Sequence, residues 1–543
     1  MARAIVWAIT MLLACGSAPV FSSDISTNNT SEDETLTSLL NALNTRSFDD
    51  KADAARSIAK TSHPRRIAVL NALLEGQIYV RKKTDQIVIA TRQDREYLLT
   101  DVISGEEIGP DSRRSVKKVT VNNRLRRIIR SLIAGLQLNA PDPQARLAAV
   151  EEMSATLDAD TIGILIAHDE SERDDDVKEA IAIVRTIYEL QAEDPNIRLA
   201  AVQVAGSNVS AEVRIRLTKI SENADETPEI KAAAHRSLKR INQTLDRYAV
   251  IETLFFGLSL GSILVLAAIG LSITFGVMGV INMAHGELMM LGAYTTYVIQ
   301  LMLPDALGYS LLIAVPAAFI VSGLVGIAIE RGIIQFLYGR PLETLLATFG
   351  VSLALQQAVR SIFSPLNRSV ASPEWMSGSL EIVQGLSITY SRLYIFIFTL
   401  IVFAALLLVM QRTRLGLEVR AVTQNRAMAK AMGINTTRVD ILTFGLGAGI
   451  AGVAGVAMSQ LTNVGPNLGQ GYIVDSFMVV VFGGVGNLWG TLVAGLSLGL
   501  VNKILEPMAG AVVAKILVLV FIILFIQKRP RGLFPQKGRA ADT

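Results

Sequence analysis

The feature that most constrains this chain is a series of long apolar runs between about residue 249 and residue 527, interrupted by few charged residues. A helix needs roughly 20 apolar residues to cross the ~30 Å hydrocarbon core of a bilayer, and a spanning segment must satisfy its own backbone hydrogen bonds. Residues 24–248, in contrast, carry most of the charge and are typical of a water-soluble domain. The sequence therefore predicts an all-α polytopic membrane domain preceded by a soluble domain.

Composition excludes several other classes of protein. The formal net charge is only +3, which does not indicate a nucleic-acid partner. Cys15 is the only cysteine, so an intramolecular disulfide and a cysteine-bound metal are excluded, and no two of the four histidines have metal-ligand spacing. We therefore expect no metal and no cofactor.

Residues 1–23 have the pattern of an export signal. Arg3 precedes an apolar stretch of about 11 residues, too short to span a bilayer, and small residues follow at 16–18. The first interpretation is a signal peptide cleaved near residues 22–24, and the alternatives are lipidation of Cys15 and an uncleaved anchor. Each of the three places residues 24–248 outside the cytoplasm.

The soluble domain shows internal repetition. Asp142-Pro143 precedes R-L-A-A-V at 146–150, and Asp194-Pro195 precedes the same letters at 198–202. A helix start followed by an alanine-rich helix, repeated along the chain, resembles HEAT-type repeats. Short β-prone runs within 77–103 predict a small β insertion. Since no residues here have catalytic spacing, we expect a mostly helical, HEAT-like interaction or scaffold domain.

Hydropathy and charge predict the topology of the membrane domain. Apolar segments are expected at 252–273, 286–303, 310–330, 343–363, 389–410, 438–460, 473–486, 488–505 and 511–527. The stretch 473–486 is short and is interpreted either as a span or as a re-entrant segment, so about 8–9 segments cross the membrane. Lys and Arg crowd the loop 411–437 and the tail after 527, and Arg331 and Arg340 flank a third region, which makes all three cytoplasmic, including 536–543. Counting back through the segments puts residues 24–248 in the periplasm of a bacterium and the spans in its inner membrane.

The cytoplasmic loop carries a candidate amphipathic helix at 418–432. Gly433 follows this helix, as a residue with positive φ often does at a helix C-terminus. Such a helix suits docking into a groove of another protein. A helix that lies on the inner leaflet is the alternative.

This loop resembles the EAA-type coupling loop of ABC importer permeases, in the variant of the branched-chain amino-acid and urea uptake families. The matching residues are Arg412, Arg414, Gly416, Arg420, Ala421, Met432, Gly433, Ile434 and Asn435. The region 257–293, with A-H-G-E at 284–287, also matches the family pattern. The resemblance covers essentially all of 250–535, so residues 249–535 are identified as a permease domain.

The resemblance implies a permease subunit, not an enzyme, that moves its solute by alternating access. The implied partners are a second homologous permease, two cytoplasmic ATP-binding subunits and a periplasmic solute-binding protein. The exported extension is similar to that of the urea-transporter permease subunit, so urea is the first prediction and a branched-chain amino acid the alternative. A passive small-solute channel and a membrane-anchored receptor remain open. The chain contains no G-x-x-x-x-G-K-[ST] sequence, so ATP hydrolysis would come from a partner.

Three polar residues are candidates for the translocation pathway. A carboxylate at bilayer depth costs roughly 2.5–3.5 kcal/mol on insertion scales, so it should face protein or water. Glu287 is such a group, and His285 and Asn282 precede it closely. A structural role for them is the alternative. The weaker candidates, which we expect to be end caps or interfacial residues, are Glu343, Thr344, Gln356, Gln357 and Asn467.

Overall fold

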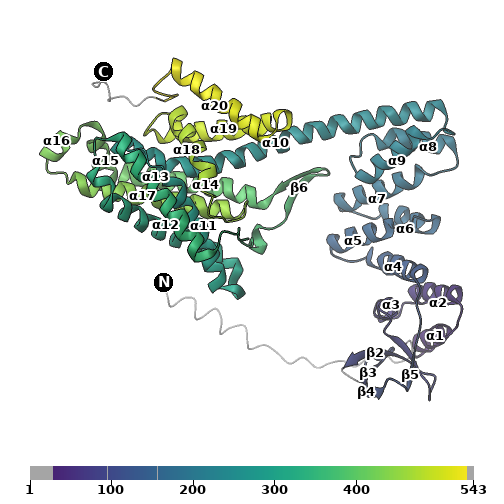
Figure 1. The fold of residues 1–543 in the computed structure, drawn as a ribbon. Helices are drawn as coiled ribbons and strands as arrows, with labels where there is room; N and C mark the ends of the chain where they lie inside the picture. The colour runs from purple at the N-terminus through teal and green to yellow at the C-terminus, as the bar shows by residue number, and fades with distance from the viewer. Residues whose placement is uncertain (1–28, 94–95, 156, 535–543) are drawn as a thin grey trace, which may run out of the picture. The chain divides into compact units, whose positions relative to one another are not determined.

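The computed structural model describes residues 29–93, 96–155 and 157–534. The chain divides into two compact units between Ile241 and Asn242, and each is described by itself (Figure 1). The predicted signal peptide with Cys15 and the predicted tail 536–543 lie outside the described residues. Helix α10 (Pro228–Met278) runs through the division without a break and also contains the domain boundary predicted at 248–249.

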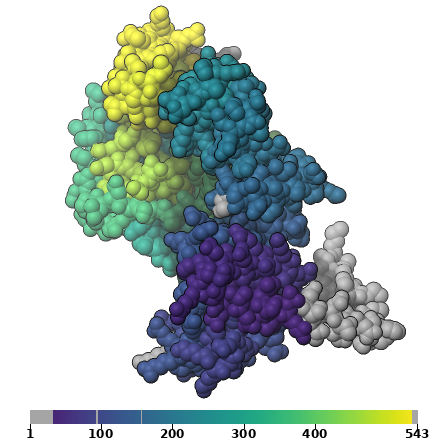
Figure 2. Space-filling view, turned by 90° about the vertical axis from the view of Figure 1, so that its right-hand side faces the viewer, coloured from purple at the N-terminus to yellow at the C-terminus, as the bar shows by residue number. Residues whose placement is uncertain are grey.

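The first unit is mostly helical with one small sheet. Its elements are α1 (Asn29–Ala42), α2 (Phe48–Lys60), α3 (Arg66–Leu74), β1 (Ile78–Arg81), β2 (Ile87–Gln93), β3 (Glu96–Asp101), β4 (Glu107–Ser112), β5 (Val116–Lys118), α4 (Asn123–Gln137), α5 (Pro143–Ser154), α6 (Ala159–Asp169), α7 (Asp175–Glu189), α8 (Pro195–Ala205) and α9 (Ala211–Glu222). Leu36, Leu70 and Ile78 belong to one apolar core that joins α1–α4 to the strands. Figure 2 shows the purple N-terminal helices lying directly on the bluer strands.

The β insertion is larger than the sequence predicted. Within the described residues the antiparallel sheet has the order β4-β3-β2-β1-β5, and strands β1–β3 fall in the predicted runs. The prediction missed β4 and β5. Strand β4 contains Gly109, Pro110 and Asp111, which are depleted in strands, and β5 is only three residues long. Pairing with β3 and β1 therefore overrides local propensity at these two edges.

The repeated Asp-Pro pairs start helices α5 and α8. Asp142 Oδ1 accepts a hydrogen bond from Gln144 N (3.1 Å), and Asp194 Oδ1 accepts from Asn196 N (2.8 Å). The proline that follows each aspartate occupies the first turn, where no intrahelical N–H is needed. Helices α4–α9 follow one another as a stack within this unit (Figure 1).

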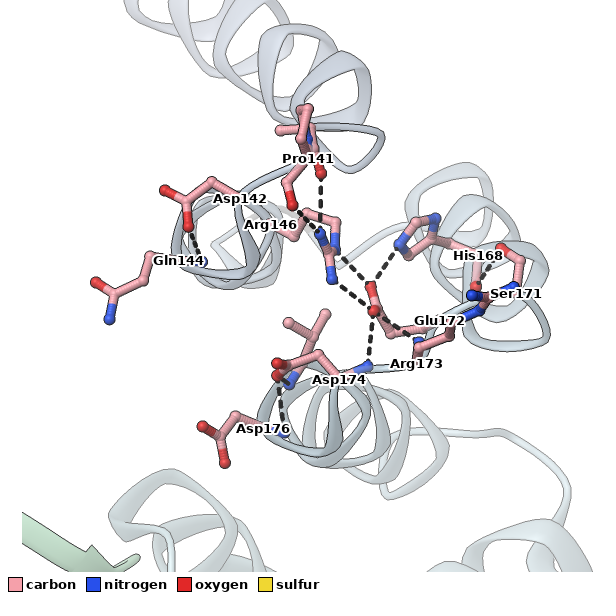
Figure 3. A network of polar contacts seen from close by, with 12 residues as sticks. Pro141, Asp142, Gln144, Arg146, His168, Ser171, Glu172, Arg173, Asp174 and Asp176 are labelled. Carbon is pink, nitrogen blue, oxygen red and sulfur yellow. Dashed lines mark hydrogen bonds and ion pairs between the residues drawn. The ribbon is translucent and has the colours of Figure 1, made fainter. Parts of the chain in front are cut away.

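A buried ion pair recurs with these repeats. Arg146 Nε and Nη2 each donate to the Glu172 carboxylate at 2.8 Å, Nη1 donates to Ala140 O (2.9 Å), and His168 Nε2 lies 2.9 Å from Glu172 Oε2 (Figure 3). Arg198 and Glu226 make the same two-point contact in the next copy, at 3.0 and 2.9 Å. The connection between successive helices is thus fixed by charge as well as by apolar packing.

Breaking the first of these pairs is expected to loosen the helices around it. The Arg146 guanidinium lowers the pKa of the Glu172 carboxyl below its usual range, so this stabilisation is complete above an unfolded pKa of about 4.3 and is lost as the pH falls below it. At pH 7, Arg146→Ala should speed hydrogen exchange of α5–α7 amides roughly tenfold or more, measured by mass spectrometry on the full chain. Arg56→Ala, which breaks an exposed pair with Asp53, is the control and should change little. Equal effects of the two variants would contradict this account.

The second unit is a helical bundle. Its elements after α10 are α11 (His285–Met302), α12 (Leu307–Gly332), α13 (Pro341–Phe363), β6 (Ser379–Val383), β7 (Leu386–Thr389), α14 (Tyr390–Arg412), α15 (Arg414–Gln424), α16 (Arg426–Ala431), α17 (Thr436–Ser459), α18 (Gln470–Gly483), α19 (Leu488–Ala509) and α20 (Ala511–Lys528), with short 3-10 turns at Pro304–Ala306, Ile334–Phe336 and Glu374–Met376. The β6–β7 hairpin was not predicted from the sequence.

Seven helices within the described residues are long and apolar enough to cross a membrane: α10, α12, α13, α14, α17, α19 and α20. They correspond to seven of the nine segments expected from the sequence. The other two segments are α11 and α18. With 14 residues, α18 is about 21 Å long, which is less than the ~30 Å core of a bilayer.

The centre of this unit is built around α17, which packs against α11 and α12. Gly292 of α11 and Gly452 of α17 allow the two backbones to touch, because a Cβ at Gly292 would lie 2.0 Å from Gly452 O. Small residues at helix crossings are how membrane helices gain close van der Waals contact. This packing against α17 also buries the first turn of α11, including His285 and Glu287, inside the bundle.

Candidate functional site

The loop that resembles a coupling loop folds as two helices between α14 and α17. The prediction of one helix at 418–432 is therefore wrong: α15 ends at Gln424 and α16 begins at Arg426. Asn425 between them has extended backbone angles, and its Oδ1 accepts a hydrogen bond from Met428 N (2.9 Å). An asparagine cap thus restarts the helix in a new direction.

Gly433 ends α16 with the positive φ that the sequence indicated. Its φ is +86°, its N–H donates to Lys430 O (3.1 Å), and Ile434 N donates to Ala429 O (3.0 Å). This is the hydrogen-bond closure that a left-handed residue gives to a helix C-terminus. Asn435 then caps the next helix, because its Oδ1 accepts from Arg438 N (3.1 Å).

The loop has a buried apolar face and an exposed face. Val419, Val422 and Ala429 form a small core with Val439 of α17. Met428 and Met432 are 60% and 76% exposed. The predicted residues Arg412, Arg414 and Arg420 are also exposed, whereas Gly416 is buried and Ala421 and Ile434 are half-buried. The exposed face therefore combines flexible apolar side chains with positive charge.

The buried face is tight at Gly416. A Cβ at this position would lie 2.1 Å from Met410 O at the end of α14. The Arg420 side chain in turn donates from Nε to Gly416 O (3.2 Å). Only glycine allows α15 to fold back this closely on α14.

Arg426, which was not predicted from the sequence as a site residue, connects α16 to the bundle. Its guanidinium makes a two-point contact with the Asp440 carboxylate of α17, one of them Nη1–Oδ1 at 3.1 Å, and lies 4.3 Å from the ring centroid of Tyr338. The Asp440 side chain is only 2% exposed. A carboxylate within a membrane-spanning helix needs a partner, so Asp440 was the available signal for this link.

The three pathway candidates are all buried but contact different helices. Asn282 Oδ1 accepts from Ala284 N (3.0 Å) in its own turn, and His285 Nε2 lies 2.8 Å from Ala267 O of α10. Glu287 Oε1 accepts hydrogen bonds from two side chains of α13. Among the described residues no hydrogen bond joins the three side chains to one another. The contacts that Asn282 and His285 make with backbone groups fit the structural alternative. Each of the three side chains also keeps one buried polar atom without a hydrogen-bond partner among the described residues: Asn282 Nδ2, His285 Nδ1 and Glu287 Oε2.

Gln356 is one of the two α13 residues that hold Glu287. It was expected to be an end cap or an interfacial residue, and that expectation is wrong, because it lies within α13 and is 3% exposed. Asn467 is exposed, and its Oδ1 accepts from Arg360 Nη2 (2.7 Å). The pairing of Gln356 with Glu287 joins residues far apart in the sequence, so the spacing of polar residues within α13 does not identify Glu287 as the partner.

Comparison with known proteins gives the family. The family model for "Branched-chain amino acid transport system / permease component" matches residues 253–526. The high-affinity branched-chain amino acid transport system permease protein BraD of Pseudomonas aeruginosa is 31% identical over 296 residues, which are 53% of this chain and 96% of the relative. The permease protein LivH of Escherichia coli K12 is 31% identical over 52% of this chain and 94% of the relative.

A more distant likeness reaches a sugar transporter. The ribose import permease protein RbsC of Escherichia coli K12 is 26% identical over 47% of this chain and 78% of the relative. No solved structure matches the chain. Because the family model matches residues 253–526, about half of the chain, and the alignment with BraD covers 96% of that relative, this chain belongs to the branched-chain amino acid transport system permease family, whose members are membrane permease subunits of ABC transporters.

Proposed function

We propose that this chain is the membrane permease subunit of an ATP-driven importer that carries branched-chain amino acids. The observation that carries the proposal is the match of residues 253–526 to this permease family, together with near-complete coverage of two amino-acid permeases. A partner supplies the ATP hydrolysis, since the sequence has no phosphate-cradling lysine motif. The transport cycle alternates access to a polar site inside the bundle.

The loop of α15 and α16 is the proposed contact for the ATPases. Exposed Met428 and Met432 can repack in a partner's groove, and exposed Arg414 and Arg420 can pair with acidic groups on its rim. Arg412, Gly416, Ala421, Gly433, Ile434 and Asn435 belong to the same proposed coupling element. A second homologous permease and a periplasmic solute-binding protein complete the proposed assembly.

The first unit is proposed to be a periplasmic, HEAT-like domain behind an export signal. The recurrence of the Arg146–Glu172 and Arg198–Glu226 pairs supports the repeat character. The clustering of Lys and Arg in the 411–437 loop supports a cytoplasmic loop. A periplasmic first unit then requires five crossings before this loop, so the proposal includes α11 as a span beside α10, α12, α13 and α14. Asn282, His285 and Glu287 remain proposed translocation residues.

Urea is the second candidate substrate. The comparisons favour branched-chain amino acids, which were the alternative predicted from the sequence. One observation favours urea: the matched permeases align with only 52–53% of this chain although 94–96% of their own length is covered, and the family model begins at residue 253, so the first unit lies outside the family match. The predicted resemblance to urea-transporter permeases was based on an exported extension of this kind, residues 24–248.

Uptake by whole cells separates the two substrates. Cells that lack this gene and cells that carry it are supplied with low-micromolar labelled leucine or labelled urea. We expect gene-dependent leucine uptake that unlabelled isoleucine and valine inhibit and that urea does not. Gene-dependent uptake of urea alone would identify urea as the substrate, and the family assignment would still hold. Unchanged uptake of both solutes would contradict the proposal.

A further inference from the structure

Helix α13 carries a polar stripe through an otherwise apolar membrane-spanning segment. The stripe consists of Thr344, Thr348, Ser352 and Gln356. These residues recur every four positions, so they lie on one face of the helix, and all four are buried. Leu346, Phe349 and Leu353, on other faces, are exposed. A polar face turned toward protein and an apolar face turned outward are expected of a helix that lines a polar route through a membrane.

Glu287, in the first turn of α11, lies against this stripe. Its Oε1 accepts hydrogen bonds from Ser352 Oγ (3.1 Å) and Gln356 Nε2 (2.6 Å). The residue is 1% exposed, and within the part of the chain that the structure describes its Oε2 has no hydrogen-bond partner. A buried carboxylate oxygen without a donor is costly, and an N–H group brought to it removes that cost.

Asn282 offers the opposite chemistry beside the same helix. Its Oδ1 accepts from Ala284 N (3.0 Å), which fixes the orientation of the amide, and its buried Nδ2 has no hydrogen-bond partner among the described residues. The next residue, Met283, donates its N–H to Thr348 Oγ1 (3.1 Å). This turn is therefore held on the polar stripe, one helical turn along α13 from Ser352.

We propose that Glu287 and Asn282 form an occluded binding site between α11 and α13 for a small solute that carries both an N–H donor and an oxygen acceptor. Glu287 Oε2 accepts from the solute nitrogen, and Asn282 Nδ2 donates to the solute oxygen. Ser352 and Gln356 are positioning residues, because they hold the carboxylate by its other oxygen. An α-amino acid and urea both present this pair of groups. The inference rests on the proposed function and adds the site at which the solute is recognised.

Two near-isosteric variants test the site in the full chain. Glu287→Gln keeps an oxygen for Ser352 and Gln356 but places a donor where the solute nitrogen binds. Asn282→Asp keeps the contact with Ala284 N but removes the free donor. We expect each to lower the maximal uptake rate of labelled leucine or urea, whichever the unaltered chain carries, roughly tenfold or more. The amount of the chain in the membrane should stay unchanged.

The neighbouring glutamine provides a matched control. Gln357 is exposed and lies off the stripe, so Gln357→Ala should retain full uptake. Gln356→Ala should alter which small amides and amino acids compete for uptake, a readout that loss of stability alone would not change.

The possible outcomes distinguish a wrong binding site from a wrong proposed function. Normal uptake by both Glu287→Gln and Asn282→Asp would overturn the site and leave the permease assignment standing. If one variant fails to reach the membrane, the uptake rate of the other variant tests the binding site. Failure of the unaltered chain to carry either solute would instead overturn the proposed function.

Discussion

Replacing Gly433 by valine should sharply reduce transport while leaving the membrane bundle folded. A non-glycine residue in the left-handed region costs about 1–2 kcal/mol, and a β-branched side chain is disfavoured further. The strain falls on the turn between α16 and α17, where the φ of Gly433 is +86°. We expect uptake to fall to roughly a tenth or less, because the loop no longer presents its exposed face in one geometry. Whole-cell uptake, normalised to the amount of chain in the membrane, measures this effect.

Gly433→Asn is the matched control. A Cβ at this position would meet nothing within 4 Å, so the penalty comes from the backbone and not from a clash. Asparagine tolerates the left-handed region far better than valine, and we expect it to retain most of the uptake. If both variants lost uptake equally, a direct need for the bare glycine surface at the partner contact would replace the strain explanation.

Removing Arg426 should both destabilise the chain and stop transport. The Asp440 carboxylate is 2% exposed, and leaving one member of a buried pair alone costs about 3–5 kcal/mol. This pair is the polar link between α16 and α17, and α17 in turn packs against α11 and α12. Arg426→Ala should therefore lower the thermal unfolding midpoint of the detergent-solubilised chain and reduce uptake severely.

A double-mutant cycle isolates the pair. Asp440→Asn should be milder than Arg426→Ala, because the Arg426 side chain is 38% exposed and can reach water. The double variant should be less destabilised than the sum of the two single variants. Arg340→Ala, which breaks an exposed pair with Glu343, is the control and should change stability little. Strictly additive effects of the two changes at 426 and 440 would show that the contact contributes no coupling energy.

The elements that the sequence predicted well are those with strong local signals. Seven long apolar segments became helices because length and hydropathy alone determine such segments. Asp142-Pro143 and Asp194-Pro195 marked helix starts because the cap and the proline act within one turn. Gly433 was recognisable as a helix end because few other residues adopt its φ.

The features that were missed depend on contacts between distant residues. Strand β4 forms only because β3 pairs with it, and its Gly-Pro-Asp sequence opposes a strand. The meeting of Glu287 with Gln356, and of Arg426 with Asp440, depends on how helices pack. The single helix predicted at 418–432 failed for a local reason, since Asn425 was not recognised as a cap.

The energy source of uptake tests the central claim most directly. Uptake of the labelled solute is measured in cells that carry this gene under two treatments. The first is arsenate, which depletes ATP. The second is a protonophore, used under conditions where glycolysis maintains ATP. A permease driven by partner ATPases predicts that gene-dependent uptake stops with arsenate and continues with the protonophore. Gene-dependent uptake that persists without ATP and runs only down the solute gradient would contradict the account and identify a passive channel.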